Sequence, residues 1–132
     1  MTSRRNNMKK IAIMGARGFV GKALTAHLQD KYTVYPITRE QFSLLDEQAV
    51  TEFFEKENID VVFHCANQGG SRKTGYDVAA PDVIGNNLKM FFNMERCLKD
   101  GMKLINFGSG AQYNKARDLV KVKEDTIGTV IP

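Results

Sequence analysis

The sequence has no tryptophan, only two cysteines and no long apolar stretch. Nowhere do about 18 apolar residues follow one another, so a membrane-spanning helix is not expected. The apolar run after the polar opening residues ends early, at Gly15, which argues against a secretory signal. Cys65 and Cys97 form no Cys-x-x-Cys pair, and each falls within an apolar stretch. These absences predict a reduced, cytoplasmic protein.

The net charge of +4 comes from one end of the chain. Residues 1–10 contain Arg4, Arg5, Lys9 and Lys10 and no acid, so the charges of the remaining residues cancel. Since no basic stripe with interleaved aromatic residues is present, nucleic acid is not expected as a partner. We interpret residues 1–8 as a flexible leader and residues 9–132 as one domain of ordinary composition, 42% apolar and 26% charged.

Four short apolar runs alternate with three stretches of helical periodicity. The runs predict strands at residues 9–14, 33–38, 59–66 and 103–107. Helices are expected over residues 19–30, from residue 47 onward after an N-capping Asp46, and from Pro81 to the Asp100-Gly101 pair. This order predicts an α/β fold, a Rossmann-like doubly wound parallel sheet. The pattern fades after Gly108, so we expect an incomplete sheet of about four strands and three helices.

A glycine-rich turn joins the first predicted strand to the first predicted helix. Gly15, Gly18 and Gly21 are spaced Gly-x-x-Gly-x-x-Gly, which allows a tight turn, close approach of a pyrophosphate and close packing of helix on strand. The spacing predicts a dinucleotide site; a purely structural turn is the alternative. The phosphate loop of nucleotide triphosphatases is excluded, because Lys22 is followed by Ala23 and not by a hydroxyl residue.

Two arginines bear on the choice of dinucleotide. Arg39 follows the second predicted strand, directly before Glu40, and Arg17 lies inside the glycine turn. Arginine near the adenosine ribose accommodates a 2′-phosphate, so this pair favours NADP(H) over NAD(H). Alternatively, both are solvated loop charges.

Several segments together resemble a known family. They are the glycine turn, residues 60–66, the Asn86-Asn87 pair and residues 107–113. With them the sequence resembles the extended short-chain dehydrogenase/reductase family, the NAD-dependent epimerases and dehydratases, and within it the GDP-fucose synthase-like enzymes most. The resemblance covers residues 9 to about 113. It implies hydride transfer between the carbon of a sugar nucleotide and a nicotinamide.

The turn and the resemblance together suggest which residues hold the cofactor. The resemblance places Ser43 and Leu44 near the adenine and Asn87 behind the nicotinamide half. It also places Cys65, Ala66 and Asn67 along the cofactor. Ser109, four residues before Tyr113, matches the family's assisting catalytic hydroxyl. The full expected cofactor-binding set is Gly15, Arg17, Gly18, Phe19, Val20, Gly21, Arg39, Ser43, Leu44, Cys65, Ala66, Asn67 and Asn87.

The sequence also departs from the family pattern. No tyrosine is followed four residues later by a lysine, so the Tyr-x-x-x-Lys pair that handles the proton in this family is absent. Ala111 stands where the resembled synthases have a cysteine, which puts epimerisation by that residue in doubt. The later residues that build the family's substrate lobe are absent as well. We therefore interpret the chain as the N-terminal, NAD(P)-binding portion of a sugar-nucleotide epimerase, dehydratase or reductase.

Two alternatives remain open. The chain is a non-catalytic NADP(H)-binding or sensor module, or a degenerate domain whose exposed sheet edge serves assembly. Because the predicted sheet is incomplete, its unpaired edge and apolar face predict a homo-oligomer. No metal site is expected, because His64 lacks further ligands at suitable spacing and is interpreted as a residue of the core or beside the cofactor.

Overall fold

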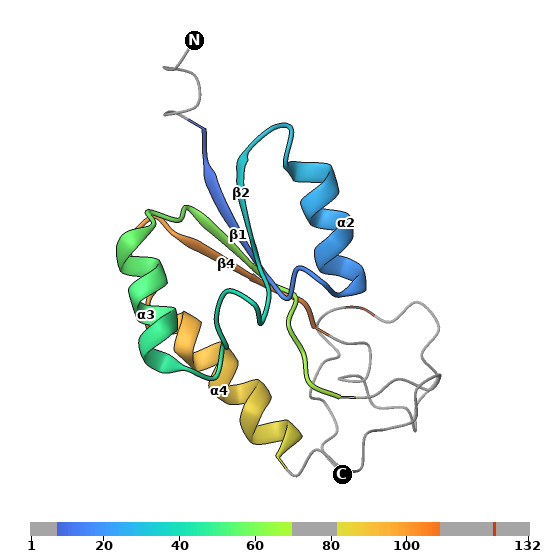
Figure 1. Cartoon of the computed structure of the whole chain (residues 1–132), viewed down its shortest axis with the longest axis vertical. Coiled ribbons are helices and arrows are strands. Elements are labelled where there is room, and N and C mark those ends of the chain that lie inside the picture. Colours follow the sequence, from blue (N-terminus) through green and yellow to red (C-terminus); the bar gives the residue numbers. More distant parts are fainter. Residues whose placement is uncertain (1–7, 70–81, 109–122, 124–132) are drawn as a thin grey trace.

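The computed structural model describes residues 8–69, 82–108 and 123 of the chain. These residues form one parallel sheet of four strands in the order β2-β1-β3-β4 (Figure 1). The strands are β1 (Lys10–Met14), β2 (Thr33–Ile37), β3 (Val61–His64) and β4 (Lys103–Asn106). The helices are α2 (Phe19–Leu28), α3 (Glu47–Lys56) and α4 (Val83–Glu95). The predicted α/β doubly wound sheet is confirmed.

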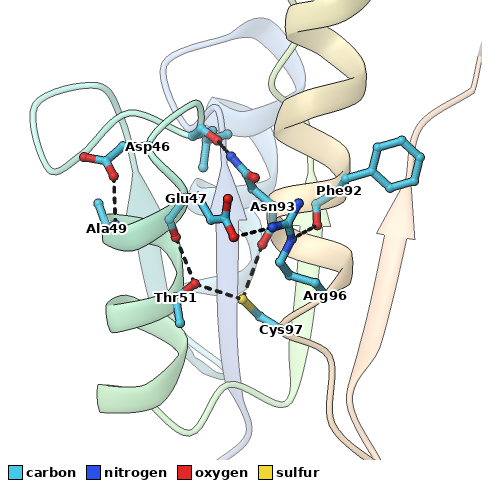
Figure 2. A network of polar contacts seen from close by, with 9 residues as sticks. Asp46, Glu47, Ala49, Thr51, Phe92, Asn93, Arg96 and Cys97 are labelled. Carbon is cyan, nitrogen blue, oxygen red and sulfur yellow. Dashed lines mark hydrogen bonds and ion pairs between the residues drawn. The ribbon is translucent and has the colours of Figure 1, made fainter.

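The ends of the elements follow from local chemistry. The carboxylate of Asp46 accepts a hydrogen bond of 3.1 Å from the Ala49 N–H, which caps α3 as predicted (Figure 2). Asp82 caps α4 in the same way through the Gly85 N–H, and Pro81 lies outside the described residues. Pro36 lies in β2, and β2 is an edge strand, where a missing ladder donor is tolerated.

The two faces of the sheet carry separate cores. Because successive side chains of a strand point to opposite faces, Ile11 and Ile13 of β1 pack toward α2 while Ala12 and Met14 contribute to the other core. The second core also contains buried side chains of α3 and α4, among them Val50. Helices thus cover both faces, α2 one and α3 with α4 the other (Figure 1).

The strand order creates a switch point beside β1. The chain goes from β1 to β2 on one side and then to β3 on the other side of β1, with all pairings parallel. The connections after β1 and β3 therefore leave in opposite directions, and in open α/β sheets ligands bind in the crevice this leaves at the carboxyl ends of the strands.

Two predictions drawn from absences can be compared with the structure. Within residues 8–69 and 82–108 no helix is long and apolar enough to cross a bilayer. Cys65 and Cys97 are both free thiols and both are partly buried, as expected of small apolar side chains. The predicted leader, residues 1–8, lies outside the described residues except for Met8.

Candidate functional site

The glycine turn closes against the end of β3 and the start of α2. Gly15 has a φ of +79°, and a Cβ there would lie 2.6 Å from the backbone nitrogen of Ala66. A Cβ on Gly21 would lie 2.2 Å from the carbonyl oxygen of Gly15. Neither backbone neighbour can move aside without displacing the turn, so both positions require glycine. The turn is fixed to β2 by the N–H groups of Gly15 and Ala16, which both donate to the carbonyl of Ile37 at 3.1 Å.

The amino end of α2 differs from those of the other two helices. Gly18 is its N-cap residue, no side chain accepts from its first-turn N–H groups, and no acid lies in that turn. In α3 and α4 an aspartate carboxylate fills that place. The uncapped N–H groups and the helix dipole make the start of α2 a favourable place for an anion.

A cavity of about 580 Å³ opens at the carboxyl ends of β1, β2 and β3. This volume lies within the usual range of small-molecule sites, roughly 300–1,000 Å³. Nine of the predicted cofactor-binding residues line it. They are Gly15, Arg17, Gly18, Arg39, Ser43, Leu44, Cys65, Ala66 and Asn67.

Sequence reasoning missed other residues of the lining. They are Ile37, Thr38, Phe42, Leu45, Gln68 and Met90. Thr38 directly follows β2, so the rule that ligands bind at strand carboxyl ends could have found it. Met90 comes from the middle of α4, where its helical spacing indicated only core packing. No local pattern could have separated it from the other apolar residues of that helix.

Four predicted residues do not line the cavity. Phe19 is 94% exposed and Val20 is 40% exposed at the start of α2, while Gly21 is buried beneath the turn. Asn87 lies in α4 behind the segment that follows β3. Their contact with a cofactor stays a prediction, and the predicted Ser109 lies outside the described residues.

Asn87 instead holds one wall of the cavity. Its Oδ1 accepts from the Gln68 N–H at 2.8 Å, and its Nδ2 donates to the Gln68 carbonyl at 2.9 Å. The neighbouring Asn86 donates to Oε1 of the same glutamine at 2.9 Å. The Asn86-Asn87 pair therefore fixes the segment after β3, which lines the cavity through Asn67 and Gln68.

The charged side chains of the lining are cationic. Arg17 and Arg39 line the cavity, and no aspartate or glutamate is among its described lining residues. The guanidinium of Arg17 forms an ion pair with Glu40, both side chains being about two-thirds exposed. Two cations beside an uncapped helix start make this end of the cavity suited to a ligand with several anionic groups.

The two titratable groups at the end of β3 are held neutral. Burial raises the pKa of the Cys65 thiol, so Cys65 presents an uncharged surface to the cavity and is no activated nucleophile. Burial lowers the pKa of His64, whose ring is buried against Phe91 with a centroid distance of 6.5 Å. Among the described residues no group of three or more metal-ligating side chains exists.

Comparison with known proteins matches this architecture. GDP-L-fucose synthase of Escherichia coli is 32% identical over 129 residues, which cover 94% of this chain and 40% of that protein. The chain thus spans well under half the length of this curated relative. A GDP-D-glycero-L-gluco-heptose synthase from Campylobacter jejuni, solved in the presence of NADPH, is 31% identical with a TM-score of 0.79 over 92% of this chain and 36% of its own.

A second solved structure agrees. The GDP-mannoheptose C4 reductase of Campylobacter jejuni, solved with NADP bound, is 32% identical with a TM-score of 0.76, over 92% of this chain and 36% of its own. Residues 11–130, nearly the whole chain, match the family described as the NAD dependent epimerase/dehydratase family. The chain belongs to the NAD dependent epimerase/dehydratase family.

Proposed function

We propose that the cavity at the carboxyl ends of β1, β2 and β3 binds a nicotinamide dinucleotide by its adenosine half, with NADP(H) favoured over NAD(H). One observation carries the proposal: the uncapped start of α2 and the side chains of Arg17 and Arg39 meet at the same cavity. A pyrophosphate suits the helix start, and a 2′-phosphate suits the arginines. Both chemistries occur together in NADP(H).

The lining suggests how each part of the ligand is held. The N–H groups of the turn and of the first turn of α2 would receive the pyrophosphate. Phe42, Ser43, Leu44 and Leu45 form a mixed apolar and polar wall suited to adenine and its ribose. On the other side, the segment from Cys65 to Gln68 would lie along the remainder of the dinucleotide.

For the whole protein we propose a sugar-nucleotide epimerase, dehydratase or reductase that acts by hydride transfer, with this chain supplying its cofactor-binding part. The named relatives are enzymes of GDP-linked sugars, and two of them were solved with NADPH or NADP. When bound, the nicotinamide would donate the hydride in a reductase, or accept and return it in an epimerase or dehydratase. The chain's own contribution is to bind and orient the dinucleotide, and Ser109 is proposed as an assisting hydroxyl.

A second candidate is binding without chemistry. None of the four tyrosines in these 132 residues is followed four residues later by lysine, so the chain has no proton-handling pair of the Tyr-x-x-x-Lys kind. A module that senses NADP(H) would need only the cavity. The two candidates share the binding site and differ in whether hydride transfer occurs, and a cytoplasmic, homo-oligomeric protein is proposed in both cases.

The preference for a 2′-phosphate is tested by replacing Arg17 and Arg39 together with alanine. Charge-assisted hydrogen bonds contribute about 1.5–3 kcal/mol each, so the loss of even one of them should weaken binding of NADPH by about 10-fold or more. Binding of NADH should change by less than about threefold, because it lacks the phosphate that these charges contact. Fluorescence titration of the reduced dinucleotides measures both affinities.

Arg96→Ala is the matched control. Arg96 is a partly exposed arginine in α4's C-cap position, paired with Glu47 and outside the cavity. Its replacement removes one positive charge from the molecule without touching the proposed site. Equal losses for NADPH and NADH in the double variant, or a loss of NADPH binding in Arg96→Ala, would contradict the proposed role of the two arginines.

A further inference from the structure

One buried polar side chain joins α4 to the far wall of the cavity. Asn93 is 1% exposed, and its Nδ2 donates a hydrogen bond of 2.8 Å to the carbonyl oxygen of Leu44, 49 residues earlier in the chain. Figure 2 shows Asn93 pointing from α4 toward the segment that precedes α3. Leu44 lies in that segment and lines the cavity.

The surroundings of Asn93 are those of a core position. Met90 and Met94, which flank Asn93 in the same helix, are buried and belong to the larger core. Burying an amide costs free energy unless its groups are hydrogen-bonded, and Oδ1 of Asn93 has no partner among the described residues. An apolar side chain of similar size would fill this space without that cost. The amide's contribution is therefore its hydrogen bond to Leu44.

The segment that Asn93 holds has little regular structure of its own. Between β2 and α3 it forms no strand, and its local hydrogen bonds are turn contacts such as that from the N–H of Asp46 to the carbonyl of Ser43. It nevertheless contributes Phe42, Ser43, Leu44 and Leu45 to the cavity. A wall without ladder hydrogen bonds needs an external contact to keep one position.

The same helix holds the opposite wall. Asn87, six residues before Asn93, bonds both backbone groups of Gln68, and Gln68 lines the cavity from the β3 side. A straight helix keeps these two attachment points at a fixed separation. The spacing of the two walls is thus set by side chains of α4, although only Met90 of that helix lines the cavity.

We propose that Asn93 is a positioning residue for adenosine binding: it fixes the wall around Leu44 and thereby the width of the cavity. The proposal rests on the proposed function, since it assigns the adenosine half of the dinucleotide to this wall. It predicts that replacing Asn93 lowers the affinity equally for ligands with and without a 2′-phosphate. Replacing Arg17 and Arg39, in contrast, is expected to lower the affinity mainly for ligands that carry this phosphate.

The test compares Asn93→Leu with the unchanged chain, using 5′-AMP and 2′,5′-ADP as probes in calorimetric titrations. Leucine fills the site but offers no donor to Leu44. A net hydrogen bond is worth about 0.5–1.5 kcal/mol, so both probes should bind about 2- to 12-fold more weakly, and by the same factor. Hydrogen exchange should accelerate in residues 42–45, while the unfolding midpoint stays near that of the unchanged chain.

Controls separate this role from general stability. Arg96 is the C-cap residue of α4, the helix that carries Asn93, and it pairs with Glu47 of α3. Arg96→Ala breaks this ion pair without touching the cavity wall and should leave both affinities within about twofold. Asn93→Ala is a second variant without a donor and without added bulk, measured at low temperature where it is folded. Its affinity should fall by the same factor for both probes, as in Asn93→Leu.

The outcomes are distinct. Unchanged affinity in a folded Asn93→Leu or Asn93→Ala variant overturns the proposal while leaving the proposed function intact. A loss confined to 2′,5′-ADP also overturns it, because the wall would then act on the phosphate alone. Failure of the unchanged chain to bind either probe overturns the proposed function and, with it, the role of Asn93.

Discussion

The ion pair between Arg17 and Glu40 leads to a quantitative prediction about phosphate binding. Both side chains are exposed, at 69% and 66%, and they come from two different segments: Arg17 from the glycine turn and Glu40 from the residues after β2. Arg17 lines the cavity and Glu40 does not. A 2′-phosphate that uses Arg17 must therefore compete with the Glu40 carboxylate. Replacing Glu40 with glutamine removes this competitor.

The size of the effect follows from the exposure of the pair. Exposed ion pairs stabilise by about 0.2–1 kcal/mol, since solvent screens the charges and the side chains lose freedom. Removal of the competing carboxylate should therefore strengthen binding of 2′,5′-ADP by about 1.4- to 5-fold. Binding of 5′-AMP should change by less than that. Since both groups are exposed, the gain should shrink as the ionic strength rises.

Calorimetric titration at low and high salt measures this difference. Glu47→Gln is the matched control, because Glu47 also forms an exposed ion pair, with Arg96, away from the cavity. That variant removes the same charge and should leave the affinity for 2′,5′-ADP unchanged. If Glu40→Gln binds 2′,5′-ADP no more tightly than the unchanged chain does, the view that Glu40 competes for Arg17 is refuted.

Two further predictions concern stability and association. His64 is buried with a lowered pKa, whereas the unfolded histidine titrates near its ordinary value of about 6.5. Protonation thus favours the unfolded state, and the free energy of unfolding should fall below about pH 6.5 by at most about 1.4 kcal/mol per pH unit. Urea unfolding at several pH values should show a weaker decrease in His64→Gln. Separately, Ile84, Leu88 and Phe92 form an exposed apolar stripe on α4, so sedimentation should detect self-association that Leu88→Glu reduces; a monomer at high concentration would contradict this.

The secondary structure could be predicted from the sequence because its causes are local. Each strand is a short apolar run, each helix has an apolar stripe, and α3 begins directly after a capping residue, Asp46. The order of strands and helices then restricts the topology to a parallel, doubly wound sheet, since crossovers are right-handed. The glycine turn could be located for the same reason, because its glycine spacing directly follows the first apolar run, and Gly21 meets backbone atoms of Gly15 and Ala16 within the same βα unit.

Part of the candidate site could be predicted from the ends of the strands, and Ser43 and Leu44 only from the family resemblance. Gly15, Arg39 and Cys65 lie at or just after such ends, and the structure places all three around one cavity. Asn87 shows the limit of this reasoning. The resemblance predicts that it lies behind the nicotinamide half of the cofactor, and it could not reveal that the amide bonds both backbone groups of Gln68. Which partner an amide takes depends on the segments that the fold brings beside it.

The sequence by itself thus determined the fold class, the glycine turn and the strand ends at which the cavity lies. Tertiary structure alone decided that Glu40 faces Arg17, that Met90 reaches the cavity and that Asn93 holds Leu44. The physical reason is the range of the forces concerned. Backbone preferences and apolar periodicity act between residues near one another in the chain. Partners 23 or 49 residues apart meet only after the sheet has formed and its helices have packed.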